Sequence, residues 1–153
     1  MSAVEENRVK EGYVASVCAK AANLDYLVTP DNAEYDFQLF SKKDIKVFGE
    51  IKARKKRYCD WFVSEKKAEF LKSICELTRC APWYVIYYEP EGIIYKLNLF
   101  RDYQIYRQDW MTTWDDEQQE EVSEWGQFIK LDQWQILKVP VTTNSRMTPM
   151  DWK

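Results

Sequence analysis

The segment from residue 45 to residue 54 alternates between two classes of side chain, and this pattern constrains the fold more than any other in the chain. A period of two is the signature of a β-strand, whose successive side chains point to opposite faces of a sheet. Glu50 and Lys52 are two residues apart, so they are predicted to share one face. Two interpretations stay open: a solvated face with a salt pair, or a carboxylate and an ammonium group directed at one reaction centre.

Length and composition indicate one globular domain. The 153 residues are 46% hydrophobic and 31% charged, which predicts a single domain over residues 1–153, with a core over about 6–100 and an extension over 101–153. No apolar run approaches the roughly 18 residues of a membrane span, and the N-terminus shows no signal peptide. We therefore expect an intracellular, cytoplasmic protein without membrane contact. Its four separated cysteines are expected to be reduced and mostly buried.

The chain contains no histidine, which excludes Ser-His-Asp triads, Cys-His dyads and histidine-based zinc sites. Any catalysis must rest on carboxylates, lysines, tyrosines, thiols or a metal held by oxygen ligands. The net charge of −3 supplies no overall attraction to nucleic acid. Basic residues are concentrated locally, at Lys52, Arg54, Lys55, Lys56 and Arg57.

Periodicity and turn residues predict a mixed α+β or α/β domain. The first 100 residues are expected to form a helix over 6–23, strands over 26–28, 34–40 and 45–53, an extended piece over 60–63, a helix capped by Ser64 and running through Arg79, and strands over 83–89 and 92–100. The acidic, Trp-rich segment 108–126 is expected to be partly helical. Residues 127–140 are expected to be a strand or short helix, and 142–153 a tail.

Three acids and a lysine stand out within these elements. Asp36 is predicted on the strand that pairs with the Glu50–Lys52 strand, so it can reach their side chains. Glu11 falls within the apolar arc of the first helix, where it needs a partner unless it only stabilises the helix terminus. Clustered carboxylates repel each other, and Mg²⁺ offsets that repulsion. These groups are the parts of a metal-assisted phosphodiester hydrolysis, with Lys52 positioning or deprotonating a water.

The order helix with Glu11, strand with Asp36, strand with Glu50-Ile51-Lys52, then a helix and a strand, resembles the PD-(D/E)xK nuclease superfamily, which includes restriction endonucleases, RecB-like exonucleases and Holliday-junction resolvases. The resemblance covers roughly residues 6–90. It implies an α-β-β-β-α-β core of the restriction-endonuclease type with a mixed sheet, to which we add a C-terminal hairpin and a Trp-rich tail region. It also implies Mg²⁺ or Mn²⁺ dependence and DNA cleavage. Asp36, Glu50 and the carbonyl of Ile51 would hold metal, Lys52 would assist the attacking water, and Glu11 would add a ligand or an outer contact.

One position departs from the family pattern. The residue before Asp36 is Tyr35, not proline, and a literal Pro30-Asp31 pair lies nearby. Asp36 is preferred because it is predicted on a strand that can face Glu50, whereas the role of Asp31 as a turn former suffices to explain it.

The basic run after the Glu50–Lys52 strand is interpreted either as a solvated loop or as a set of phosphate contacts. The predicted DNA-binding residues are Arg54, Lys55, Lys56, Arg57, Tyr58, Lys66 and Lys67. Tyr58 and Trp61 fit base stacking and core packing equally well.

Three interpretations remain in competition, and the third is a plain structural subunit in which the Glu50–Lys52 pair is only a surface contact. The leading one is a Mg²⁺-dependent DNA endonuclease that recognises branched or junction structures. The alternative is a non-catalytic nucleic-acid-binding or protein-interaction module on the same fold. Trp110, Trp114, Trp125 and Trp134 are interpreted either as a cover for the sheet or as the surface of a homodimer.

Overall fold

The alternating segment forms β3 (Asp44–Arg54), an interior strand of a six-stranded mixed sheet in the computed structural model of the chain. The structure describes residues 2–30, 32–115 and 119–138. β3 pairs antiparallel with β2 (Phe37–Ser41), which confirms the predicted hairpin, and parallel with β5 (Ala81–Tyr88). The strand order is β1-β2-β3-β5-β6-β9, where β1 is Asp25–Val28, β6 is Ile93–Asn98 and β9 is Gln135–Lys138.

The two helices begin at serine caps. α1 (Ala3–Ala22) starts earlier than predicted because the Ser2 hydroxyl accepts a hydrogen bond from the Glu5 amide at 3.2 Å. α2 (Glu65–Thr78) is capped by Ser64, as its sequence predicts. Leu77, in the last turn of α2, is 87% exposed although it is apolar. None of the described helices combines the length and apolar composition that a membrane span requires.

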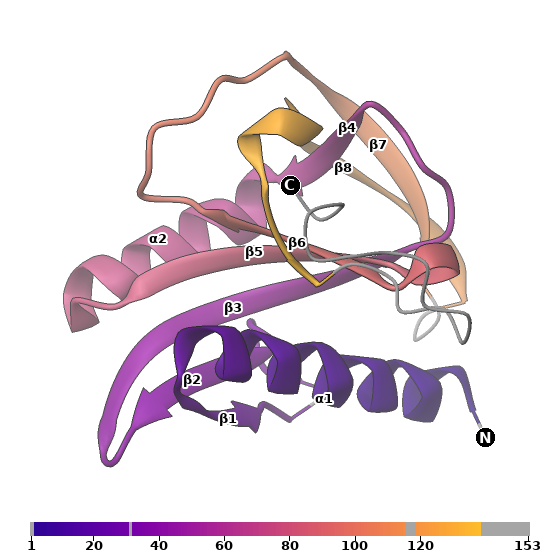
Figure 1. Ribbon diagram of the computed structural model, residues 1–153. Coiled ribbons are helices and arrows are strands. Elements are labelled where there is room, and N and C mark those ends of the chain that lie inside the picture. The colour runs from indigo at the N-terminus through magenta and orange to yellow at the C-terminus, as the bar shows by residue number, and fades with distance from the viewer. Residues whose placement is uncertain (1, 31, 116–118, 139–153) are drawn as a thin grey trace, which may run out of the picture.

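The two faces of the six-stranded sheet carry separate hydrophobic clusters. Figure 1 shows α1 on one side of β3 and β5, and α2 with the strands of a second sheet on the other. Ile51 packs toward α1, with Val14 and Cys18. Phe48 packs toward α2, with Leu71 and Trp61. Because side chains alternate along a strand, Glu50 and Lys52 lie on the same face as Phe48, the face of α2.

The C-terminal part of the described chain contains a second sheet, which the sequence did not predict. Its strand order is β4-β8-β7, formed by β4 (Asp60–Ser64), β8 (Glu120–Lys130) and β7 (Arg107–Asp115). The prediction that residues 108–126 are partly helical is wrong. The acidic residues suggested a helix, but Trp110 pairs with Trp125 across a β-hairpin, and β8 is held by β4 on its other edge. In Figure 1 this hairpin runs along the right-hand side of the molecule.

The remaining segments complete the first sheet and the core. Short 3₁₀ helices at Glu89–Glu91 and Leu131–Gln133 precede β6 and β9. Trp61 is 1% exposed, which places it in the core and removes it from the candidate stacking residues. Trp134 is also buried, and its indole N–H donates to the Ile129 carbonyl at 3.1 Å. The four cysteines are free thiols, and only Cys59 is exposed. The predicted tail, 142–153, lies outside the described residues.

A close contact between two strands fixes the backbone beneath the candidate site. Gly49 lies opposite Phe37, and a Cβ atom at position 49 would sit 2.1 Å from the Phe37 ring. The phenylalanine ring therefore packs directly on the backbone of β3, one residue before Glu50. Glycine is required here for lack of space, since any side chain would push β2 away from β3.

Candidate active site

Asp36 is attached to β3 through both its backbone and its side chain. The sequence predicts Asp36 in the middle of a strand, but β2 begins at Phe37, so Asp36 lies directly before the strand. Its amide donates to the Gly49 carbonyl at 2.8 Å, and its Oδ2 accepts from the Ile51 amide at 2.7 Å. At the end of the β2–β3 ladder, the Asp36 carboxylate thus accepts the hydrogen bond that a backbone carbonyl of β2 would otherwise accept from Ile51. Because N–H and C=O of one strand residue point to the same edge, the Ile51 carbonyl also faces Asp36.

Glu50 is buried at the same point of the sheet, on the neighbouring strand. It is 2% exposed, and its Oε2 lies 3.4 Å from Lys52 Nζ and 3.9 Å from Lys67 Nζ. Its Oε1 is buried and has no hydrogen-bond partner among the described residues. A buried carboxylate oxygen without a partner is unfavourable, so the site is built to receive a positive or hydrogen-bonding group at Oε1.

Burial makes the charged form of Glu50 unfavourable. Loss of solvent, with the charge of Asp36 as the second cause, raises the pKa of Glu50 to about 8, although Lys52 and Lys67 act in the opposite direction. A hydrogen bond to Asp36 also favours the protonated form, so in the metal-free protein the balance at Glu50 is moved toward the neutral carboxyl. A divalent cation at this point would replace that proton, because metal ligands must be deprotonated.

Lys52 remains a cation in this environment. Burial alone would lower its pKa, but attraction to Glu50, Tyr84, Glu124 and Asp36 outweighs burial, and the pKa of Lys52 is raised. An ammonium group that is difficult to deprotonate is a poor general base but a strong hydrogen-bond donor. The chemistry of the site therefore favours Lys52 as a group that orients a water or stabilises negative charge.

These groups line one cavity of about 450 Å³, which opens to solvent. Asp36, Glu50, Ile51 and Lys52 come from the first sheet, and Glu11 reaches the cavity from α1. All four of the predicted acidic and basic residues are therefore brought to one place, although their roles stay predictions. Asp31, the rival acid, lies outside the described residues.

The donor set fits a hard divalent cation with few protein ligands. In the part of the chain that the structure describes, no group of three or more His, Cys, Asp and Glu side chains is arranged to hold a metal ion. Glu11 thus does not complete a three-carboxylate site with Asp36 and Glu50. Two carboxylates and a carbonyl are nevertheless sufficient for Mg²⁺, which usually keeps several waters and binds substrate phosphate. The unpartnered Oε1 of Glu50 is the observation that supports this fit.

The chain matches no protein-family model, and no curated protein matches its sequence. Its structure is similar to that of Hjc, a Holliday junction resolvase from the archaeal hyperthermophile Archaeoglobus fulgidus. The similarity has a TM-score of 0.53 and covers 81% of this chain and 88% of that chain, at 11% sequence identity. The chain has the restriction-endonuclease-like fold. The α-β-β-β-α-β core is formed by α1, β1, β2, β3, α2 and β5. β4 lies between β3 and α2 in the chain but belongs to the second sheet.

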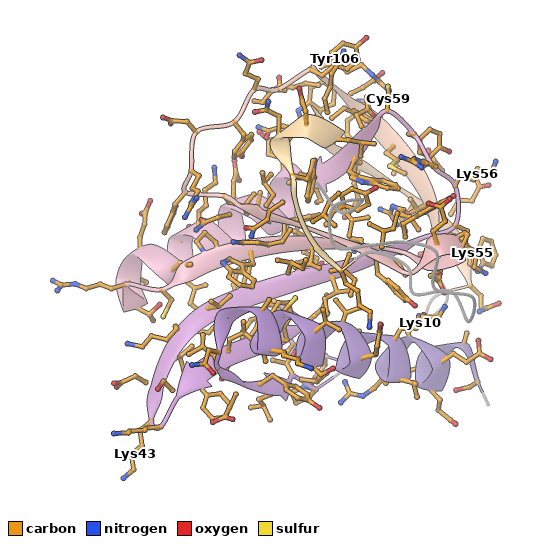
Figure 2. All side chains as sticks on the ribbon, in the orientation of Figure 1. Lys10, Lys43, Lys55, Lys56, Cys59 and Tyr106 are labelled. Carbon is orange, nitrogen blue, oxygen red and sulfur yellow. The ribbon has the colours of Figure 1, made fainter. Side chains whose placement is uncertain are left out.

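The predicted DNA-binding residues separate into two groups. Arg54 and Lys67 line the cavity, and Lys67 contacts Glu50. The others lie outside it and are exposed: Lys55, Lys56, Arg57, Tyr58 and Lys66. In Figure 2, Lys55 and Lys56 point outward on the same side of the molecule as Lys10, whereas Lys43 lies at the opposite end. The basic run is therefore near the cavity but not part of its wall.

Among the cavity residues that sequence reasoning missed are one basic, one aromatic and one acidic side chain. Lys10 lies one residue before Glu11 on α1, and Trp114 and Glu124 come from the β7–β8 hairpin. Glu124 Oε1 accepts a hydrogen bond from the Ser64 hydroxyl at 3.3 Å, which links the hairpin to the start of α2. No local pattern in the sequence showed that the segment around Glu124 would form a strand and cover the site.

Replacing Glu50 with glutamine is expected to stabilise the metal-free protein increasingly as the pH rises from about 4.5 to 8. The pKa of Glu50 is raised from its ordinary 4.5 to about 8, so the folded chain keeps a proton that the unfolded chain releases. The free energy of unfolding of the wild type therefore falls with pH in this window, by at most about 1.4 kcal/mol per pH unit. Glutamine has nearly the shape of glutamate but cannot ionise, so the variant lacks the contribution of residue 50 to this pH dependence.

The measurement is the difference in Tm between Glu50→Gln and the wild type across this pH range in EDTA. Glu76→Gln, on an exposed position of α2, is the control and should show a constant difference. A constant difference for Glu50→Gln as well would contradict the raised pKa.

Proposed function

We propose that this chain is a Mg²⁺- or Mn²⁺-dependent DNA endonuclease of the PD-(D/E)xK type that hydrolyses phosphodiester bonds in branched or junction DNA. The observation that carries the proposal is the meeting of Asp36, Glu50 and Lys52 in one cavity, with a buried carboxylate oxygen of Glu50 that lacks a partner. A purely structural ion pair does not require such an oxygen. The similarity to an archaeal Holliday junction resolvase supports the same reading at the level of the fold.

Asp36 and Glu50 would hold the cation, together with the carbonyl of Ile51. When bound, the cation supplies a Lewis acid that stabilises charge on the phosphate and lowers the pKa of a bound water. The hydrogen bond from the Ile51 amide to Asp36 Oδ2, at 2.7 Å, orients the Asp36 carboxylate before any ligand arrives. This preorganisation reduces the rearrangement needed at the moment of reaction.

Lys52 and Lys67 act as cations in the proposed mechanism. Both Nζ atoms lie within 4 Å of Glu50 Oε2, so both are held at the carboxylate that faces the reacting phosphate. The raised pKa of Lys52 keeps the proton on Nζ, which donates a hydrogen bond to the attacking water or to a phosphate oxygen. Lys67 adds a second positive charge. It lies in the first turn of α2, where the helix dipole contributes a further partial positive charge.

DNA would reach the cavity along its basic rim. Lys10, Arg54 and Lys67 line the cavity from three different elements, and Lys55 and Lys56 extend this charge into solvent. Phosphate contacts of this kind position a nucleic acid without reading its sequence. In this proposal the protein recognises the shape of the DNA rather than its sequence, which agrees with a branched DNA substrate.

Neutralising the basic run is expected to weaken DNA binding and to reduce its salt dependence. Each phosphate contact contributes about 0.9 to the slope of log K against log salt concentration. A Lys55→Gln, Lys56→Gln, Arg57→Gln variant should lower the slope by about 2 to 3 if all three contacts are made. The measurement is fluorescence anisotropy of labelled duplex DNA at several salt concentrations. Lys42→Gln, Lys43→Gln at the β2–β3 turn is the control, and an unchanged slope in the first variant would make the run a solvated loop.

The decisive experiment incubates the protein with four-way junction, flapped, single-stranded and linear duplex DNA, with Mg²⁺, Mn²⁺ or EDTA. We expect metal-dependent cleavage of the branched substrates and none in EDTA. Binding without cleavage of any substrate in either metal would instead support the alternative, a non-catalytic nucleic-acid-binding module. Absence of both binding and cleavage would reject both.

A further inference from the structure

The β7–β8 hairpin presents two different faces, and both are connected with the cavity. One face carries Thr113, Val122 and Glu124, which line the cavity. The alternate positions form the other face and are exposed: Trp110, Thr112, Trp114, Glu121, Ser123 and Trp125. Trp114 belongs to the exposed face and also lines the cavity, so it lies at the rim where the two meet.

The three tryptophans of this exposed face are left in water at a free-energy cost. Trp110, Trp114 and Trp125 are 61%, 56% and 37% exposed. Trp110 and Trp125 contact each other edge to face, with ring centroids 5.6 Å apart, but each keeps an open side. Exposed aromatic residues gathered on one small surface indicate a binding site, because burying them would be favourable.

The walls of the cavity differ in charge, and the difference orients a nucleic-acid strand. On the α1–β3–α2 side the lining basic residues Lys10, Lys52, Arg54 and Lys67 outnumber the lining acids Glu11, Asp36 and Glu50, although Lys10 is paired with Glu89. The hairpin wall contributes Glu124 and no lysine or arginine among its described lining residues. Phosphates are therefore attracted to the α1–β3–α2 side and repelled by Glu124 on the hairpin side. A strand placed in this way directs its bases at the hairpin, where Trp114 offers an aromatic ring.

Resting on the nuclease activity proposed above, we infer that Trp114 stacks on an unpaired base of the DNA strand whose phosphate occupies the cavity, and that Trp110 and Trp125 extend this stacking surface. In an intact duplex the bases face one another and cannot meet the hairpin. The substrate class is accordingly DNA with an unpaired or extruded nucleotide beside the cleaved bond. Stacking suits this task because every base has a π-face, so recognition needs no particular sequence.

The acidic residues of the hairpin indicate that it contacts a DNA base rather than the phosphate backbone. Glu120 and Glu121 are exposed on the hairpin, and they would repel the phosphates of a duplex lying across it, whereas Asp109 is paired with Arg107 at 3.1 Å. A second copy of this chain is the competing occupant of the tryptophan face. The like charges of two identical acidic hairpins would oppose that contact, which favours the DNA strand.

The test measures binding in EDTA, where cleavage is absent, by anisotropy of two labelled 12-nucleotide strands. One strand carries all its bases, and the other has abasic sites throughout its central half with the same number of phosphates. The wild type should bind the complete strand more tightly by about 5- to 150-fold, since stacking is worth about 1–3 kcal/mol per base. Trp114→Ala should lose most of this preference, Trp114→Phe should keep much of it, and Trp110→Ala, Trp125→Ala should reduce it further.

Phe100→Ala is the control, because Phe100 is an exposed aromatic residue, 45% exposed, outside the cavity lining. It should leave the preference unchanged. Equal affinity of the wild type for both strands would overturn the inference, and so would an equal loss for both strands in Trp114→Ala. A change in oligomeric state of the tryptophan variants by light scattering, with the base preference intact, would assign the face to a second copy and also overturn it.

This binding test, combined with the cleavage assay in Mg²⁺ and Mn²⁺ described above, separates the inference from the nuclease proposal. A base preference that depends on Trp114, in a protein that cleaves no DNA with Mg²⁺ or Mn²⁺, would reject the nuclease activity and keep the stacking site. Metal-dependent cleavage without a base preference would do the reverse.

Discussion

Cleavage by a Lys52→Ala variant is expected to be about 10²–10³-fold slower than cleavage by the wild type, because removing one fixed donor that stabilises negative charge in the transition state costs about this much. Lys52 Nζ lies 3.4 Å from Glu50 Oε2 and keeps its proton, so its removal takes a cation and a hydrogen-bond donor from the reacting phosphate. The measurement is the single-turnover cleavage rate of the best substrate with saturating Mg²⁺. Metal and DNA binding, followed by calorimetry and anisotropy, should largely persist.

A matched control is available on the same strand. Lys46 lies near the start of β3, is exposed and does not line the cavity, so Lys46→Ala should cleave at the wild-type rate. If Lys52→Ala also cleaves at that rate, Lys52 is not the catalytic lysine, and the assignment of the Glu50–Lys52 pair is wrong.

An Asp36→Asn variant is expected to lose cleavage and most of its affinity for divalent cations. Asparagine keeps the oxygen that accepts the hydrogen bond from the Ile51 amide, so the β2–β3 junction should stay folded. It lacks the negative charge that the cation requires, and metal assistance is worth several kcal/mol in such reactions, which corresponds to a rate loss of roughly 10³-fold or more. Titration of Mn²⁺ followed by calorimetry, together with the cleavage rate, measures both effects.

The rival acid supplies the comparison for this variant. Asp31 follows Pro30 in the sequence and lies outside the described residues, and Asp31→Asn is expected to keep most of the activity. The reverse pattern, with an active Asp36→Asn and an inactive Asp31→Asn, would move the metal site to the turn between β1 and β2.

The sequence alone determined the local part of the site. A period of two over residues 45–54 placed Glu50 and Lys52 on one strand face, because successive side chains of a strand alternate whatever surrounds it. The same reasoning predicted the antiparallel β2–β3 hairpin and the cap at Ser64. It also brought Asp36 within reach of Glu50, although not to its correct place. The strand begins at Phe37, one residue after Asp36, and Asp36 accepts a hydrogen bond from the Ile51 amide where the β2–β3 ladder ends.

Only the tertiary structure decided which distant elements close the cavity. The acidic segment 108–126 carries composition typical of a helix, and it becomes a hairpin because β4 pairs with β8, a contact between residues some 65 positions apart, as in Trp61 and Ile129 or Ser64 and Gly126. That pairing brings Glu124 and Trp114 to the site, and α1 adds Lys10. Such contacts depend on chain topology rather than on local periodicity, so no pattern along the sequence reveals them. The pKa of Glu50 is likewise decided by burial, which local sequence does not specify.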